Sequence, residues 1–268
     1  MSVKREVGLE KYYTASEVAA DCVEFLSERY NMISFDNIVE PSSGDGSFAD
    51  HLPSKTITVD IDPSTPAKIH KSFLEYEPPH GKTLVIGNPP FGARSSMAFQ
   101  FLYHAAEFAD VIAFILPNSF HGTNFNNRVP EYFHLVQTKD VSGMWGDNYL
   151  NLTFFVYEKR AERRYKVVEQ TEHKDFDMVH AHLAWIDELE FHNLKKHYEF
   201  AMSQAGNIKV KDLIDLPKKG SHFFIRGLVP GVRKVFENMS FDGGSNVAHK
   251  SLSKAEIVKQ YKSLTEEA

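Results

Sequence analysis

Short apolar runs alternate with helical patterns over residues 1–159 of this 268-residue chain. Apolar residues recur at helical spacing over about 15–30, and Thr14 and Glu17 before them have the spacing of a capping box. A second amphipathic helix is expected from Ser95 onward. Runs typical of strands occur at 38–40, 56–59, 69–74, 84–87, 111–116, 134–138 and 153–157. This alternation predicts an α/β doubly wound sheet whose ligand site lies at the carboxyl ends of its strands, with the last two runs paired as an antiparallel edge hairpin.

The alternation fades over residues 160–268, where the pattern is hardest to interpret. A short helix is expected over 229–236, and a C-terminal helix over 250–264 that begins at Ser253. This length suits a small α+β extension, or extra strands packed on the first sheet. We therefore expect two parts, an α/β domain over 1–159 and an extension over 160–268 that is a candidate recognition element.

Composition places the chain among ordinary globular proteins, with 42% hydrophobic and 25% charged residues. No apolar run approaches the ~20 residues of a membrane span, and the first residues have no apolar signal-peptide core. A single cysteine, Cys22, excludes an internal disulfide and fits a reducing compartment. These features predict a cytoplasmic protein that does not enter a membrane.

The formal net charge of −6 is unevenly distributed. Residues 1–159 carry 12 Lys and Arg against 20 Asp and Glu, a balance of −8, whereas residues 160–268 carry 18 against 16, a balance of +2. Within 209–262 the balance is 11 against 5, or +6. If the partner is a polyanion, that segment is where its phosphates would be met, although scattered surface lysines would give the same count.

Polar and glycine residues follow the first two strands. Gly44 and Gly46 come directly after the strand at 38–40, where glycine lets a backbone approach a ligand closely. Asp60 ends the second strand, and a carboxylate there can accept both hydroxyls of a ribose. Because no G-x-G-x-x-G fingerprint and no phosphate-loop lysine is present, a pyrophosphate is not the expected ligand.

The run at 84–87 ends in Asn88-Pro89-Pro90-Phe91. Proline has no N–H to continue a sheet, so the strand stops there. An asparagine held at a strand end by two prolines presents acceptor oxygens beside an aromatic face. Those groups suit a planar amine, whose N–H groups need acceptors and whose ring needs a stacking partner.

In this order, three motifs resemble those of the class I S-adenosylmethionine-dependent amino-methyltransferases, and most of all the N6-adenine enzymes with an Asn-Pro-Pro-Phe motif. The residues that carry the resemblance are Glu40-Pro41-Ser42-Ser43-Gly44-Asp45-Gly46-Ser47-Phe48, Val59-Asp60-Ile61-Asp62 and Asn88-Pro89-Pro90-Phe91. Tyr13-Thr14-Ala15-Ser16-Glu17-Val18 is similar to the family's leading motif, and Ile115-Leu116-Pro117-Asn118-Ser119-Phe120 to a later strand-end motif. The resemblance covers residues 11–159 and implies a Rossmann-like class I methyltransferase sheet.

The resemblance also implies roles for individual residues. The catalytic residues would be Asn88, Pro89, Pro90 and Phe91, with Asn88 and the Pro89 carbonyl accepting the amine N–H groups and Phe91 stacking on the base. The S-adenosylmethionine site would be formed by Thr14, Glu40, Ser42, Gly44, Gly46, Asp60, Phe73 and Asn88. One departure concerns Ser72, which stands where family members usually have Asp.

The expected activity is that of a transferase that methylates N6 of adenine in DNA or RNA. Guanine-N2 methylation, protein-glutamine methylation and a catalytically silent binding module remain alternatives. Asn118, Phe223 and Arg226 are further candidates for substrate binding, although the alternation of a half-buried strand also explains Phe223. No metal site is expected, because His180 and His182 have no nearby third ligand in the sequence. A protein partner or a homodimer is left open by the sequence.

Overall fold

The chain divides into two compact parts, which we call unit 1 (Met1–Val167) and unit 2 (Val168–Ala268). The computed structural model describes residues 13–146, 148–205, 208–217, 219–241 and 252–265. The division falls after Val167 rather than after residue 159, the boundary that the sequence suggested. The segment that follows the last strand of unit 1 therefore belongs to that unit.

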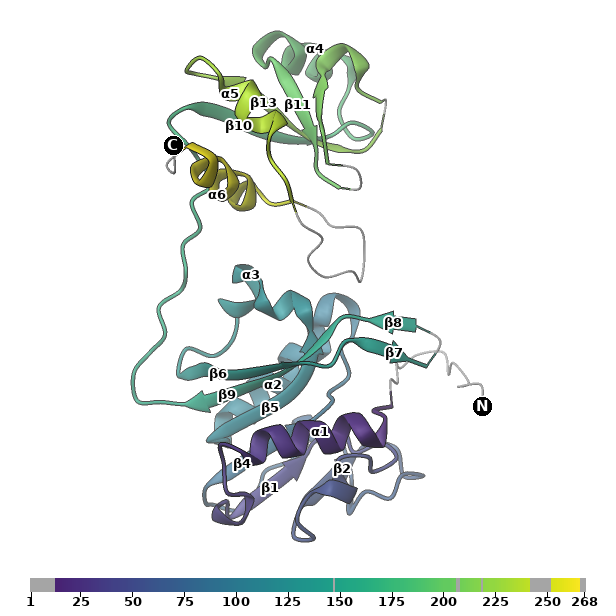
Figure 1. The fold of residues 1–268 in the computed structure, drawn as a ribbon. Coiled ribbons are helices and arrows are strands. Elements are labelled where there is room, and N and C mark those ends of the chain that lie inside the picture. The colour runs from purple at the N-terminus through teal and green to yellow at the C-terminus, as the bar shows by residue number, and fades with distance from the viewer. Residues whose placement is uncertain (1–12, 147, 206–207, 218, 242–251, 266–268) are drawn as a thin grey trace. The chain divides into compact units, whose positions relative to one another are not determined.

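Unit 1 is built on a seven-stranded sheet with the order β3-β2-β1-β4-β5-β9-β6 (Figure 1). The strands from β3 to β5 pair in parallel, and β9 runs antiparallel to both β5 and β6. The strand bounds are β1 (Asn37–Glu40), β2 (Ile57–Asp60), β3 (Ile69–His70), β4 (Thr83–Gly87), β5 (Val111–Pro117), β6 (Phe133–Asp140) and β9 (Leu152–Lys159). This is the expected Rossmann-like α/β sheet, and the predicted antiparallel pair is confirmed as β6 and β9, with β6 at the edge.

Helices cover both faces of this sheet (Figure 1). α1 (Ser16–Ser27) packs on one face and α2 (Ser96–Phe108) on the other. The core under α1 includes Cys22, Leu26, Ile38, Leu84 and Ile86. The core under α2 includes Val39, Val85, Phe99, Leu102 and Ile112. Neighbouring residues of each strand thus alternate between two apolar layers, and each fully buried side chain contributes about 1.5–3 kcal/mol.

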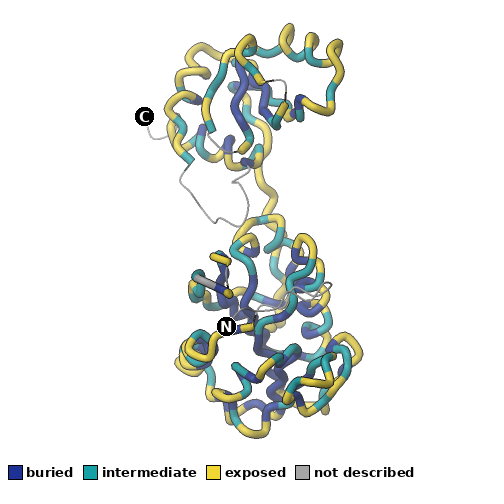
Figure 2. Tube along the Cα trace, turned by 90° about the vertical axis from the view of Figure 1, so that its right-hand side faces the viewer, coloured by how far each residue is buried: buried dark blue, intermediate teal, exposed yellow. Residues whose placement is uncertain are grey.

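Smaller elements complete unit 1. A four-residue helix, α3 (Thr123–Asn126), follows the loop after β5, and β7 (Gly143–Trp145) pairs with β8 (Asn148–Leu150) in a separate hairpin. The core strands form the buried interior, and exposed segments surround them (Figure 2).

The capping box predicted for α1 is wrong. The N-cap residue is Ala15, and no side chain caps the helix. The hydroxyl of Thr14 instead accepts a hydrogen bond from Nδ2 of Asn88 at 3.3 Å. A side chain to which the sequence spacing assigns helix initiation therefore joins the segment before α1 to the end of β4.

Unit 2 has a four-stranded antiparallel sheet with the order β10-β13-β11-β12. Its elements are β10 (Phe176–His182), α4 (Glu188–His197), β11 (Phe200–Ser203), β12 (Val210–Asp212), β13 (Ser221–Gly227), α5 (Val232–Glu237) and α6 (Lys254–Thr265). Residues of α5 and α6 pack in one apolar cluster of this unit, and residues of α4 pack in the other. The extension is thus of the α+β class, as predicted.

The two helices expected in this part of the chain are confirmed with shifted bounds. α5 and α6 correspond to the predicted helices over 229–236 and 250–264. Ser253 does begin α6, because its hydroxyl and the carboxylate of Glu256 exchange hydrogen bonds with each other's backbone N–H at 3.2 and 2.7 Å. Residues 242–251 of the basic segment 209–262 lie outside the described residues. No helix among the described residues combines the length and apolar character needed to cross a bilayer.

Candidate functional site

A cavity of about 220 Å³ lies at the carboxyl ends of β1, β2 and β4 in unit 1. Parallel strands bring the loops after these strands to one edge of the sheet, which is where open α/β sheets bind ligands. The cavity is lined by ten of the predicted site residues: Thr14, Glu40, Ser42, Gly44, Asp60, Phe73, Asn88, Pro89, Pro90 and Phe91. The residues expected to bind a cofactor and those expected to bind an amine thus share one cavity.

Gly44 lies in a turn that only glycine adopts without strain. Its φ is +53°, and a Cβ added there would lie 3.2 Å from the Tyr13 ring. Its N–H donates to Oδ2 of Asp60 at 2.8 Å, which ties the loop after β1 to the end of β2. Gly46, with φ +92°, is part of the same turn but is not among the residues that line the cavity.

Backbone groups hold the carboxylate of Asp60 in one orientation. Its Oδ2 accepts from Gly44 and its Oδ1 accepts from the N–H of Asp62, each at 2.8 Å. An ionised carboxylate has about two acceptor sites on each oxygen, so one site per oxygen is left for a ligand. This geometry suits the recognition of two adjacent hydroxyls.

Glu40 is a buried acid that lines the cavity. Only 2% of it is exposed, and its Oε2 has no hydrogen-bond partner among the described residues. Burial, with a smaller contribution from Asp45, Asp50 and Asp60, raises the pKa of Glu40 to about 8. The carboxyl is therefore mostly protonated at neutral pH, and a cation in the cavity would favour its ionised form.

Two hydroxyl groups fix Asn88 at the end of β4. Nδ2 of Asn88 donates to the Thr14 hydroxyl at 3.3 Å, and the Ser42 hydroxyl donates to the Asn88 carbonyl oxygen at 3.0 Å. The first contact orients the amide so that Oδ1 is directed away from Thr14. Both the backbone and the side chain of Asn88 are thus positioned before any ligand arrives.

The other end of the Asn-Pro-Pro-Phe motif is held by the start of α2. The carbonyl oxygen of Phe91 accepts from the N–H groups of Met97 and Ala98 at 3.1 and 3.2 Å. In the turn between Phe91 and Met97, Arg94 and Ser95 have positive φ angles of 52° and 59°. Left-handed residues other than glycine cost about 1–3 kcal/mol each and persist where their surroundings require them. The strained turn keeps the Phe91 ring next to the cavity.

Phe73 forms a rigid aromatic wall of the cavity. It is 2% exposed, and its ring lies 5.1 Å from Phe101 and 5.0 Å from His104, measured between centroids. Ser72 lines the cavity beside it, and the Ser72 hydroxyl accepts from the N–H of Leu74 at 3.3 Å. This hydroxyl occupies the position at which the resemblance leads one to expect Asp.

Asn118 is held at the same edge of the sheet but does not line the cavity. β4 and β5 pair in parallel with Gly87 opposite Phe114, so the chain after each strand emerges at one edge. The Thr153 hydroxyl donates to Oδ1 of Asn118 at 2.7 Å. The Asn118 amide is therefore oriented by β9.

Phe223 does not belong to the candidate site. It is 2% exposed and lies in the apolar core of unit 2, so its ring is not available to stack on a base. The alternation of a buried strand, here β13, explains this residue. Arg226 on the same strand is exposed and forms an ion pair with Asp177. Both residues are in unit 2.

Sequence reasoning missed several residues that line the cavity. These are Tyr13, Pro41, Ser47, Phe48, Ile61, Thr65, Leu74, Met97 and Phe101. Tyr13, Pro41, Phe48 and Ile61 lie within the motifs that carry the resemblance, so their position beside predicted site residues could have identified them. Met97 and Phe101 had no such signal, because helical spacing alone does not show which apolar side chains of α2 reach the cavity. Within the described part of the chain, no group of three or more His, Cys, Asp or Glu could hold a metal ion.

Comparisons with known proteins give similarity at the level of structure. No family model matches the chain, and no curated protein sequence matches it. A candidate RNA methyltransferase from Pyrococcus horikoshii is similar, at 16% identity and a TM-score of 0.46 over 59% of this chain and 92% of that one.

Two other solved structures are similar to a comparable extent. A type I restriction-modification methyltransferase subunit from Streptococcus thermophilus has 15% identity and a TM-score of 0.44, over 56% of this chain and 45% of that one. Magnesium protoporphyrin IX methyltransferase from Synechocystis, solved with S-adenosylmethionine bound, has 11% identity and a TM-score of 0.43, over 54% and 79%. At such low identities and TM-scores, these similarities decide nothing about the substrate of this chain.

Proposed function

We propose that this protein is an S-adenosylmethionine-dependent methyltransferase that acts on the N6 amine of adenine in DNA or RNA. The observation that supports this most is the shared cavity, lined by Gly44, Asp60 and Phe73 as well as by the motif that starts at Asn88. A cofactor bound by the first group would place its reactive end near the second. If Gly44 only formed a turn and Asn88 only ended a strand, neither role would require the two residues to line one cavity.

The residues present fit the cofactor. Its ribose offers two adjacent hydroxyls to Asp60, whose oxygens each have one remaining acceptor site. Its adenine can lie against the rigid ring of Phe73. The partnerless Oε2 of Glu40 is a suitable counter-charge for the cationic groups of the methionine part. Bound there, S-adenosylmethionine supplies an electrophilic methyl group.

The motif at the end of β4 has the groups that the other reactant needs. An adenine N6 is a weak nucleophile because its lone pair is delocalised into the ring. In the proposed complex, Oδ1 of Asn88 and the carbonyl oxygen of Pro89 accept its two hydrogens, which localises the lone pair and stabilises the developing positive charge. Phe91 stacks on the base, which offsets part of the cost of removing it from a duplex.

The test is transfer of labelled methyl to single-stranded DNA, duplex DNA, RNA and a protein extract. Replacement of one pre-oriented polar group at a reacting centre typically costs on the order of 100-fold in rate or more, so Asn88→Ala should lose transfer to that extent. Asn124→Ala is the matched control, because Asn124 is an exposed asparagine of α3, and it should transfer methyl at the wild-type rate.

Other outcomes distinguish the alternatives. Label in guanine or in protein glutamine would replace the proposed substrate. Cofactor binding without label in any acceptor would favour a silent binding module. Equal transfer by Asn88→Ala and wild type would contradict the role of the motif.

A further inference from the structure

A second cavity of unit 1 shares no lining residue with the first. Its volume is about 380 Å³, and its walls contain three basic residues and two tyrosines. It lies between α2, the loop before β6 and the segment after β9. We call it the basic cavity, and it is lined by Tyr103, Asn127, Arg128, Val129, Glu131, Arg164, Tyr165 and Lys166.

Hydrogen bonds hold one wall of the basic cavity against the other. Nδ2 of Asn127 donates to the Val167 carbonyl oxygen at 2.8 Å, and the N–H of Val167 donates to Oδ1 of Asn127 at 2.9 Å. The N–H of Arg164 donates to the Glu131 carbonyl oxygen at 2.6 Å. The segment that carries Arg164 and Lys166 is thus fixed along the loop before β6.

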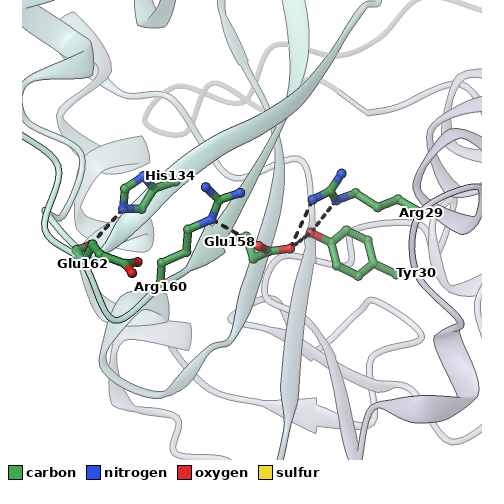
Figure 3. Close-up of polar contacts among 6 residues, drawn as sticks. All are labelled: Arg29, Tyr30, His134, Glu158, Arg160 and Glu162. Carbon is green, nitrogen blue, oxygen red and sulfur yellow. Dashed lines mark hydrogen bonds and ion pairs between the residues drawn. The ribbon is translucent and has the colours of Figure 1, made fainter.

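The start of this segment is fixed as well (Figure 3). Glu158 of β9 accepts from the Tyr30 hydroxyl at 2.6 Å and from Nε of Arg160 at 3.3 Å. Nε2 of His134 on β6 lies 2.9 Å from the Glu162 carbonyl oxygen. These contacts leave little freedom in the course of the chain before the basic cavity.

Arg164 is a built-in positive charge of the wall. Its guanidinium donates to the carbonyl oxygens of Asn126 and Val129, each at 2.9 Å. Burial lowers the pKa of Arg164 from its ordinary value, but arginine keeps its charge in proteins. Its three nitrogens have no carboxylate partner among the described residues, so the charge is not neutralised locally.

Arg128 and Lys166 add positive charge on the solvent side. The guanidinium of Arg128 lies over the Phe99 ring, 3.5 Å from its centroid, which fixes the group while its N–H edge stays available. Both residues are exposed, and neither forms an ion pair within the described part of the chain. The one acid of the cavity, Glu131, is paired with Arg163 at 3.4 Å.

A stack of rings connects the basic cavity to the catalytic edge of the sheet. Phe99, under Arg128, stacks on Phe120 at 4.7 Å between centroids. Phe120 comes two residues after Asn118, in the turn at the carboxyl end of β5. The Arg128 side of the basic cavity is thus two ring contacts away from the turn that follows β5 at the catalytic edge.

We propose that the basic cavity binds phosphate groups of the nucleic acid strand that presents the target base. Cations with free N–H groups beside exposed aromatic rings form the usual combination for a single strand. Tyr103 and Tyr165, 42% and 93% exposed, are the rings available to a neighbouring base. This inference rests on the proposed function, since it assigns a contact to the same nucleic acid substrate.

The test measures equilibrium binding of DNA and RNA oligonucleotides of one sequence to the full chain at several salt concentrations. Lys166→Ala removes one exposed phosphate contact, so its affinity should fall below that of wild type. The slope of log affinity against log salt should become shallower by about 1. Lys82→Ala is the control, because Lys82 is also exposed and is not among the residues that line the basic cavity.

The outcomes separate the two proposals. If wild type binds, and Lys166→Ala has the same affinity and the same salt slope as Lys82→Ala, the basic cavity is not a phosphate site. Absence of binding by wild type to either nucleic acid would overturn the proposed substrate and this inference together. An effect in RNA alone or in DNA alone would identify which strand the cavity binds.

Discussion

At the scale of single residues, the candidate site is held by groups that sequence spacing assigns to other tasks. Thr14 has the spacing of a helix cap but accepts a hydrogen bond from Asn88. Asp60 is held in place by two backbone N–H groups, which leave acceptor sites for a ribose. Such contacts join residues far apart in the chain, so motif positions could be predicted from the sequence but their hydrogen-bond partners could not.

Glu40 should make cofactor binding dependent on pH. Its pKa in the free protein is about 8, and the positive groups of the cofactor would lower that pKa in the complex. A proton must then leave on binding below about pH 8, so affinity should rise with pH up to that value and level off above it. Titration calorimetry between about pH 6 and about pH 9 checks this.

The matched variants isolate the group. Glu40→Gln should bind with no such rise, whereas Glu28→Gln, at an exposed site on the end of α1, should behave as wild type. The same pKa means that the free folded state holds more protons than the unfolded chain between the ordinary pKa of 4.5 and about 8, so its stability should fall as pH rises through that window. A rise in affinity with pH that persists in Glu40→Gln would assign the effect to another group.

Gly44→Ala should destabilise the protein. Its φ of +53° costs a residue with a Cβ about 1–2 kcal/mol, and the added atom would meet the Tyr13 ring at 3.2 Å. Gly143→Ala is the control, because a Cβ there meets nothing within 4 Å. Urea unfolding of both variants measures the difference, and equal free energies of unfolding would show that the turn tolerates a side chain.

At the scale of elements, most strands of the main sheet in unit 1 were predictable, but the end of the unit was not. The run at 69–74, expected as one strand, is a strand only over Ile69–His70 and is followed by a 3-10 helix over Phe73–Glu75. An unbroken apolar run such as 111–116 has few alternatives to a central strand, and β5 confirms it. The boundary was placed after residue 159 because the strand pattern ends there. The polar segment 160–167 is joined to unit 1 by hydrogen bonds such as those between Asn127 and Val167. Hydrogen bonds of this kind produce no pattern of apolar residues in the sequence, so the sequence could not show that the segment belongs to unit 1.

Fragments that end on either side of this segment should differ in stability. A fragment over 1–167 keeps the contacts of Arg164 and Val167 with the loop before β6, whereas a fragment over 1–159 loses them. Net contributions of about 0.5–1.5 kcal/mol per hydrogen bond predict a lower melting temperature for the shorter fragment. Thermal unfolding followed by circular dichroism measures this. Equal melting temperatures would place the boundary of the folded unit at residue 159.

At the scale of the whole molecule, all of the proposed chemistry lies in unit 1. Both cavities are lined only by residues of that unit. Unit 2 was expected to contribute Phe223 to substrate binding, but the alternation of β13 directs this ring into the core. The sequence of two neighbouring aromatic residues, Phe223 and Phe224, is the same whether one ring faces solvent or helices cover both faces of the sheet. The sequence alone therefore could not decide this point.

The most direct measurement is identification of the methylated nucleoside. Nucleic acid incubated with the protein and S-adenosylmethionine would be digested to nucleosides and analysed by mass spectrometry, beside an Asn88→Ala reaction. We expect N6-methyladenosine, or its deoxy form, from wild type and only a trace from the variant. A methyl group on guanine N2, or the same yield of N6-methyladenine from the variant, would contradict it.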